Sequence, residues 1–156
     1  MIINGTSLYL KSPIKNMEPS KITGQVTTHG LGEAGYDIRI KQEIRFSDGH
    51  VWINGGRHDG NFVIASAMEE FEMPSNLVGI VHDKSTWARR GLSVFNTVIE
   101  PGFKGGLTLE LVYHGVSNLL IPTGSGIAQV VFHRTIEEAF YNGKYQGQST
   151  EPTPAR

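Results

Sequence analysis

The amino-acid sequence predicts a mostly β protein, a barrel or a sandwich, with one or two short helices. Two observations lead to this fold class. The chain has 19 glycines and 7 prolines among its 156 residues, spread without a fixed period, and such residues mark turns between short segments. The segments between them have strand length, and several alternate apolar and polar residues. A chain of this length fits one domain, and no linker or repeat divides it, so we expect residues 1–156 to form a single domain.

The N-terminal half is predicted to form five strands joined by polar loops. Alternation of apolar and polar residues is typical of half-buried strands. The residues Ser-Asp-Gly-His at 47–50 have the composition of a hairpin turn. The predicted strands are Ser7–Leu10, Tyr36–Ile40, Ile44–Phe46, Val51–Ile53 and Phe62–Ala67, with polar loops over Ser12–Thr28 and Asn54–Gly60.

The C-terminal half combines five more apolar segments with the best helix candidates. Glu69–Pro74 is predicted to be a charged connection, which Pro74 ends. One helical turn is predicted over Ser85–Arg90 and a second short helix over Ile136–Phe140. The predicted strands are Leu77–His82, Leu92–Val98, Leu107–Val112, Leu119–Pro122 and Ile127–Phe132, and the polar tail from Tyr141 is not expected to pack by itself.

Composition excludes several classes of function. The formal net charge is -1, so no general field attracts nucleic acid or an anionic membrane, and we expect neither as a partner. The chain has no cysteine, which excludes disulfides, thiolate metal sites and a cysteine nucleophile and fits a reducing compartment. No secretory leader and no apolar stretch of roughly 20 residues is present. We therefore expect a cytoplasmic protein.

Six histidines raise the question of a metal site. None forms a His-x-x-x-His or His-Glu-x-x-His pair, and the zinc deaminase signature requires cysteines that this chain lacks. Scattered histidines in loops and at strand ends are usually solvated or structural. We expect no metal bound directly by the protein. The histidines are His29, His50, His58, His82, His114 and His133.

An anion site is predicted at Lys84-Ser85-Thr86. These residues follow an apolar strand and open a helical turn, so free backbone N–H groups lie beside two hydroxyls and a cation. The glycines of a Walker P-loop are missing upstream. An ordinary capped helix with a solvated basic face is the alternative interpretation.

Two acidic residues flank a glycine-rich turn. Glu110 lies within a leucine-rich strand, on the same face as Thr108 and opposite the leucines. Its carboxylate must face solvent or a polar pocket, because burying an unpaired charge is costly. In a partly apolar pocket its pKa would rise, which suits general acid–base chemistry. Glu100, just before Pro101, is either a second site acid or an acid of the turn.

Four segments in order carry a family resemblance. They are Ala34-Gly35-Tyr36-Asp37, Lys84-Ser85-Thr86-Trp87-Ala88-Arg89-Arg90-Gly91-Leu92, Val98-Ile99-Glu100-Pro101-Gly102-Phe103-Lys104-Gly105 and Gly126-Ile127-Ala128-Gln129. Together they resemble motifs of the dCTP deaminase/dUTPase superfamily, over a stretch from Ala34 to Arg156. The resemblance implies a dUTPase-like distorted β-barrel (β-clip) that forms trimers with active sites between subunits.

Two features favour the deaminase branch. Thr108-Leu109-Glu110 is similar to the deaminase motif whose glutamate is catalytic, and the tail from Lys144 to Arg156 resembles deaminase C-termini. Two other residues depart from the family pattern. Glu100 stands in place of the usual aspartate, and Phe95 stands where deaminases often have histidine.

Residue roles follow from the resemblance. It implies that Glu110 activates the water that attacks C4 of cytosine, while Ser85 and Arg89 hold this water and the base. Lys84, Ser85 and Thr86 would also face the phosphates, and Glu100 would contact the sugar. The tail, residues 141–156, would be mobile and would close over the site. The full set of implied substrate contacts is Lys84, Ser85, Thr86, Trp87, Ala88, Arg89, Glu100, Thr108, Leu109, Glu110, Tyr141, Lys144 and Gln148.

The resemblance also sets the cofactor and the alternatives. Mg²⁺ would reach the site on the substrate triphosphate, without zinc. The expected reaction is deamination of dCTP to dUTP and ammonia, and dTTP is a possible inhibitor. A dUTP pyrophosphatase, or a bifunctional enzyme that releases dUMP and pyrophosphate, is the first alternative. A non-catalytic nucleotide-binding trimer is the second.

Overall fold

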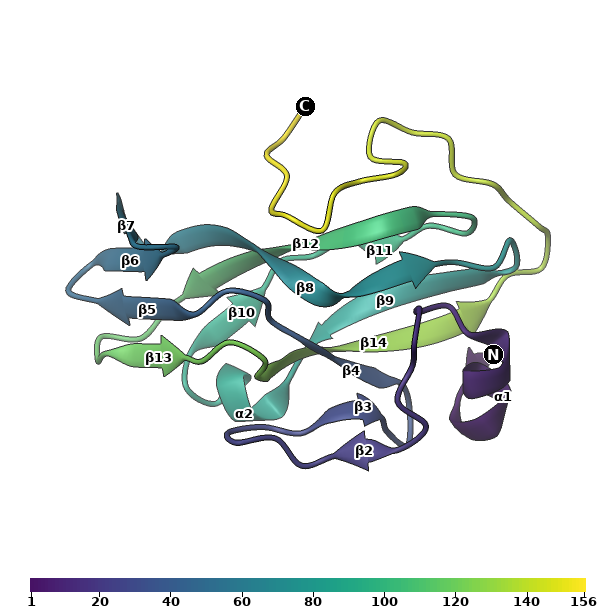
Figure 1. Ribbon diagram of the computed structural model, residues 1–156, viewed down its shortest axis with the longest axis horizontal. Coiled ribbons are helices and arrows are strands. Elements are labelled where there is room, and N and C mark those ends of the chain that lie inside the picture. The colour runs from purple at the N-terminus through teal and green to yellow at the C-terminus, as the bar shows by residue number, and fades with distance from the viewer.

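A computed structural model describes all 156 residues and shows a mostly β protein with two short helices (Figure 1). The predicted fold class is confirmed. A seven-stranded sheet has the order β11-β9-β14-β4-β3-β2, with β1 paired to β14, and smaller sheets have the orders β10-β12-β8 and β13-β5-β6-β7. The first half comprises β1 (Ile2–Ile3), α1 (Gly5–Lys11), β2 (Lys21–Ile22), β3 (His29–Leu31), β4 (Tyr36–Arg39), β5 (Ile44–Ser47), β6 (His50–Ile53), β7 (Gly56–Asp59) and β8 (Phe62–Glu72). The second half comprises β9 (Leu77–Asp83), α2 (Ser85–Ala88), β10 (Leu92–Val94), β11 (Val98–Ile99), β12 (Lys104–Tyr113), β13 (Leu119–Ile121) and β14 (Gly126–Arg134).

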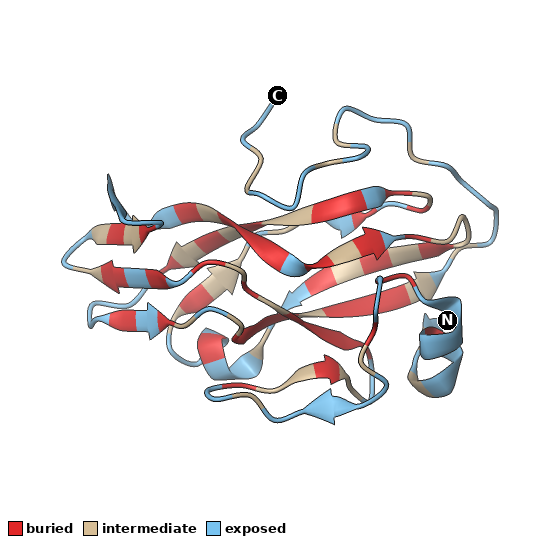
Figure 2. Ribbon diagram, viewed as in Figure 1, coloured by how far each residue is buried: buried red, intermediate tan, exposed pale blue.

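One hydrophobic core lies between the sheets. Thirty buried residues form a single cluster, and Figure 2 shows them in red along β4, β8, β12 and β14, while α1 and the C-terminal tail are largely exposed. Side chains alternate along β12: Leu109 and Leu111 are fully buried, whereas Thr108 and Glu110 are only half-buried. The predicted separation from Glu110 is therefore confirmed for Leu109 and Leu111. It is wrong for Leu107, which is only partly buried and lies at an irregularity in the β8–β12 register between Gly106 and Thr108.

Most predicted strands occur where the alternation placed them. The β5–β6 hairpin turns at Asp48 and Gly49, whose φ angles of 51° and 74° are those of a two-residue hairpin turn. The central helical turn is also confirmed, as α2. The arrangement of the site depends on these correctly predicted elements.

Two predicted elements near the ends of the chain, the strand Ser7–Leu10 and the helix Ile136–Phe140, were wrong. Ser7–Leu10 belongs to helix α1, not to a strand, because only Leu8 of its apolar residues is buried and the chain needs only one residue per turn to reach the core. Ile136–Phe140 is not helical. Ile136 and Phe140 are exposed there, and Ala139 N–H donates to the Ser75 carbonyl at 2.8 Å, which holds the chain against β9 in an irregular path.

Three connections also differ from prediction. The loop Asn54–Gly60 contains strand β7, which pairs with β6 along an edge whose residues are all exposed. Leu92–Val98 divides into β10 and β11, which pair with different sheets. The charged segment Glu69–Glu72 continues β8 as far as Glu72. Its acids do not interrupt the strand, because Glu72 is exposed and the inward-facing Glu69 is paired.

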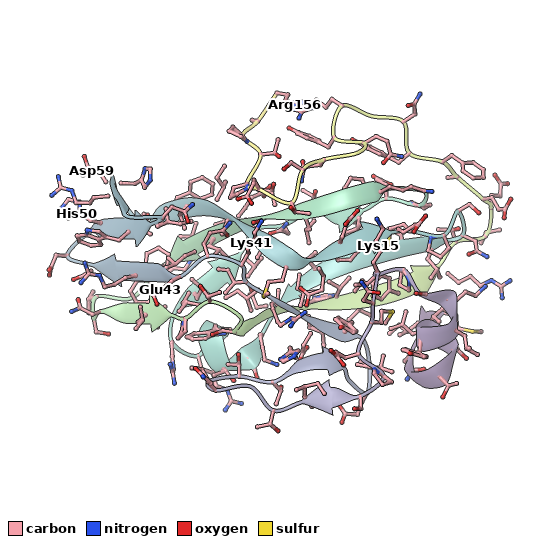
Figure 3. The ribbon with its side chains drawn as sticks, in the orientation of Figure 1. Lys15, Lys41, Glu43, His50, Asp59 and Arg156 are labelled. Atoms are coloured by element: carbon pink, nitrogen blue, oxygen red, sulfur yellow. The ribbon has the colours of Figure 1, made fainter.

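The tail lies across the outer face of β12. Gly147 N–H donates to the Lys104 carbonyl at 2.8 Å, and Gly106 N–H donates to the Gln148 carbonyl at 2.9 Å. A Cβ at Gly106 would lie 2.3 Å from the Ser149 carbonyl oxygen, so only glycine permits this approach. In Figure 3 Lys41 lies below the tail that ends at Arg156, and its ammonium bonds the Thr150 carbonyl at 3.2 Å. Mobility of the tail remains a prediction.

An ion pair between Arg39 of β4 and the buried Glu69 of β8 generates the first prediction. The Glu69 side chain is 2% exposed and accepts both Arg39 Nε and Arg39 N–H at 2.8 Å. Glu69→Ala leaves the guanidinium without its partner, and we expect a loss of about 3–5 kcal/mol in the free energy of unfolding. Urea denaturation measures it. Glu72→Ala, three residues along β8 at an exposed ion pair with Lys104, is the matched control and should change stability little. Equal losses in both variants would contradict this account.

Candidate active site

A cavity of about 680 Å³ opens between β8, β12, the segment Asn96–Glu100 and the tail. Strands β8 and β12 provide one wall. Directly paired residues of neighbouring strands point to the same face of the sheet, and so does every second residue along each strand. The tail covers this wall (Figure 1). Of the predicted site residues, the cavity is lined by Glu100, Thr108, Glu110, Tyr141 and Gln148.

Glu110 lies in an apolar part of this cavity. It pairs in register with Ile64 of β8, and its neighbour on that strand face is Phe62, opposite Val112. Burial raises the pKa of the Glu110 carboxyl above its usual value, and no counter-charge in the chain offsets this effect. A carboxyl with a raised pKa exchanges protons closer to neutral pH, as a general acid–base group requires.

Glu100, directly after β11, lines the same cavity. It precedes a turn in which Phe103 N–H donates to the Glu100 carbonyl at 3.1 Å, and the Glu100 side chain is exposed. The tail is anchored at this turn, because Tyr141 N–H donates to the Pro101 carbonyl at 2.8 Å. The two acids that the sequence singled out therefore share one cavity.

Thr108 connects β12 to the tail. Its hydroxyl oxygen accepts Gln148 Nε2 at 3.1 Å and Thr153 N–H at 3.0 Å, so two separate points of the tail are bound to one side chain. Its neighbour Leu109 was implied as a substrate contact. The side chain of Leu109 is fully buried in the core on the other face of β12, so it does not reach the cavity.

Lys144 was also implied as a substrate contact, and it does not line the cavity in this structure. Its ammonium bonds the Arg156 carbonyl and lies 5.1 Å from the centre of the Tyr145 ring. Tyr145 itself lines the cavity. Because Arg156 Nη1 donates back to the Lys144 carbonyl at 3.0 Å, the tail ends in a closed loop that carries two cations.

The segment Lys84–Arg89 lies apart from the cavity. Helix α2 is at the lower edge of Figure 1, with the central strands between it and the tail. The Lys84 ammonium bonds Asp37 at 2.5 Å and the Thr28 hydroxyl at 3.2 Å, with 12% of its side chain exposed. Trp87 is buried, and its indole N–H donates to the Gly126 carbonyl at 2.7 Å. Lys84 and Trp87 were implied as substrate contacts, but within one chain their polar groups are bonded to other residues of the protein.

The other four residues of this segment are free on the surface. Ser85, Thr86, Ala88 and Arg89 are exposed and line no part of the cavity around Glu110. The cavity itself is lined by no lysine or arginine. Within one chain, therefore, Glu100 and Glu110 line the cavity, whereas the exposed Arg89 lies elsewhere.

Several cavity residues were missed by the sequence reasoning. Phe62 and Ile64 share the alternation of β8, but only the register with β12 places them beside Glu110. The remaining missed residues come from the segment that follows β10, which includes Val98 of β11, and from the tail, where periodicity gives no signal. They include Asn96, Val98, Tyr145, Thr153, Pro154 and Ala155.

The chain shows neither a cluster of metal ligands nor a helix that could span a membrane. No three histidine, aspartate or glutamate side chains gather in a way that would hold a metal ion. Neither helix has the length and apolar character needed to cross a bilayer.

Comparison with known proteins identifies similar chains. A family model described as dCTP deaminase-like matches residues 57–135. The dCTP deaminase of Campylobacter concisus is 34% identical over 146 aligned residues, which cover 79% of this chain and 78% of the relative. The dCTP deaminase of Campylobacter jejuni is 33% identical over 161 aligned residues, which cover 86% and 87%.

Solved structures show the same fold. A 2'-deoxycytidine 5'-triphosphate deaminase from Agrobacterium tumefaciens superposes with a TM-score of 0.59 at 18% identity, covering 86% of this chain and 48% of that one. The EIAV dUTPase superposes with a TM-score of 0.55 at 19% identity, covering 92% and 97%. The dUTPase-like fold expected from the sequence is therefore confirmed.

The raised pKa of Glu110 predicts a pH-dependent effect on stability. A carboxyl whose folded pKa lies above its unfolded pKa destabilises the folded protein at higher pH, where it must ionise in the cavity, and not at low pH, where it is neutral in both states. We expect Glu110→Gln to melt at a higher temperature than wild type at pH 8, with the difference vanishing toward pH 4. Differential scanning fluorimetry across this range measures it. Glu43→Gln, at an exposed glutamate, should show no such trend; a lower melting temperature for Glu110→Gln at pH 8 would contradict the prediction.

Proposed function

Since the chain belongs to the dCTP deaminase-like family, we propose that it deaminates dCTP to dUTP and ammonia. The observation that carries this proposal is the Glu110 carboxyl, half-buried among apolar side chains in a cavity large enough for a nucleotide. An acid–base group in such surroundings suits hydrolytic removal of an amino group.

The proposed chemistry needs one water and one carboxylate. Glu110 takes a proton from water as the water oxygen bonds to C4 of cytosine, and it passes this proton to ring N3. It then transfers the proton of the new C4 hydroxyl to the amino nitrogen. The C4–N bond then breaks, ammonia leaves, and a carbonyl remains at C4. Hydrogen-bond donors held in place, and not a protein-bound zinc, stabilise the charge that develops in this step. We assign these donors to Ser85 and Arg89.

Those donors must come from a second copy of the chain. Ser85, in α2, and Arg89, directly after it, are exposed and line no part of the cavity of their own chain, and that cavity has no lysine or arginine in its wall. A triphosphate carries several negative charges that need cations or N–H donors. We propose a homotrimer in which α2 of one copy faces the Glu110 cavity of another.

The ion pair between Lys84 and Asp37 changes which residues we assign to the phosphates. The Lys84 ammonium is bound to Asp37, so we assign the triphosphate to Thr86 and Arg89 of the partner copy and to Lys144 and Arg156 of the tail. Mg²⁺ enters this arrangement as part of the substrate, bound to the phosphates. We assign the sugar to Glu100, which lines the same cavity as Glu110.

A second candidate function is hydrolysis of dUTP. Glu100 lies in the same cavity as Glu110 and occupies the position where the resemblance implies an aspartate that orients water in dUTPases. A dUTP pyrophosphatase, alone or with deamination, would use this second acid.

Product analysis separates the candidates. We expect wild-type protein incubated with dCTP and Mg²⁺ to release ammonia, and Glu110→Gln to lose about 10²-fold or more of this rate while still binding dCTP. Enzymatic ammonia and pyrophosphate assays, with dCTP and dUTP supplied separately, measure the products, and calorimetry measures binding.

The other outcomes are equally clear. Pyrophosphate without ammonia would favour the dUTP pyrophosphatase. Nucleotide binding with neither product would favour a non-catalytic nucleotide-binding trimer. Undiminished turnover in Glu110→Gln would remove Glu110 from its role.

A further inference from the structure

Strand β10 leaves β12 next to Glu110. Leu92, Ser93 and Val94 pair with β12, ending with Val94 opposite Leu111. One more bond follows, in which Phe95 N–H donates to the Glu110 carbonyl at 2.8 Å. The chain then crosses to the seven-stranded sheet, where Val98 pairs with Ile80 of β9. This crossing forms a wall of the cavity, and it ends the backbone ladder beside Glu110.

The side chain of Asn96 continues the ladder where the backbone stops. Its amide Nδ2 donates to the Thr108 carbonyl at 2.7 Å, and its Oδ1 accepts Glu110 N–H at 3.0 Å. Glu110 N–H can only donate and the Thr108 carbonyl can only accept, so a single orientation of the amide satisfies both. A carboxamide has one carbonyl and one N–H₂ group, and it replaces a peptide group of the missing strand.

We propose that Asn96 is a positioning residue for Glu110. The main chain after β10 turns away from β12, and the Asn96 amide keeps the edge of β12 hydrogen-bonded at that point. The cavity can therefore open beside Glu110 while the β12 backbone at Glu110 stays held. The consequence for catalysis rests on the proposed deamination, whereas the consequence for the β12 backbone does not.

The residue type is specific to this task. Alanine at position 96 removes both bonds, leaving Glu110 N–H and the Thr108 carbonyl without a protein partner. Aspartate accepts Glu110 N–H but sets a second oxygen against the Thr108 carbonyl, and it adds a negative charge near Glu110. A like charge makes ionisation of a neighbouring carboxyl harder, so Glu110 would lose its proton at higher pH.

Asn61, directly before β8, provides a matched control because its side chain also bonds the backbone of β12. Its Nδ2 donates to the Tyr113 carbonyl at 2.9 Å, three residues beyond Glu110, and it does not line the cavity. Asn61→Ala therefore removes an amide bond to the β12 backbone at a place remote from the proposed chemistry.

Amide hydrogen exchange in the full-length protein tests the structural part without any substrate. We expect Asn96→Ala to speed exchange of the Glu110 amide by about tenfold or more, the factor that corresponds to losing one hydrogen bond. Exchange at Leu111, which pairs with Val63 of β8, should change much less. Asn61→Ala should leave Glu110 unchanged. Unchanged exchange at Glu110 in Asn96→Ala, or an equal effect of Asn61→Ala, would overturn the proposal.

Kinetics with dCTP tests the catalytic part. We expect Asn96→Ala to lower kcat about tenfold with KM changed less than about threefold, because orientation is lost and binding is not. Asn96→Asp should shift the acidic limb of the kcat/KM profile to higher pH, which a merely structural defect would not do. A profile with the wild-type limb, or a loss confined to KM, would contradict it. Absence of ammonia from wild type would instead reject the proposed function and leave the exchange result standing.

Discussion

The alternation of side chains along β12 is the constraint on which the rest of the structure depends. Pairing with β8 on one side and β10 on the other fixes which face each residue takes, so Leu109 and Leu111 enter the core while Thr108 and Glu110 enter the cavity. A shift of one residue would exchange these faces and bury the carboxylate. The strand that completes the core therefore also carries the proposed general base.

Charge is divided in the chain in a way that points to assembly. The cavity contains acids and apolar groups, and the exposed Arg89 of α2 lies elsewhere. Lys84, the other cation of that segment, neutralises Asp37 in a nearly buried pair and helps to fix the start of α2 against β4. In the proposed homotrimer, each chain presents two incomplete halves of an anion-binding acid–base site, and a neighbouring copy would supply what each half lacks.

Sequence reasoning reached the parts of this account that follow from periodicity. Alternation located β4 and β12 and placed Glu110 opposite the leucines, and the motif at Lys84 located α2. Periodicity did not find α1 or the irregular path at Ile136–Phe140, because packing against distant segments decides both. Periodicity also did not indicate that the Lys84 ammonium is paired with Asp37, because these residues are far apart in the sequence. Nor did it indicate that the Asn96 amide replaces the backbone of a neighbouring strand, because this depends on a contact across the edge of β12.

Subunit complementation tests most directly the central claim that each site combines Glu110 of one copy with α2 of another. Glu110→Gln and Arg89→Ala proteins, each inactive alone, are unfolded, mixed and refolded together, with wild type taken through the same steps. We predict that the mixture regains dCTP deamination, because hybrid trimers contain sites with both residues intact. Mixed trimers that form, as shown by two affinity tags, yet stay as inactive as their parents would contradict the account.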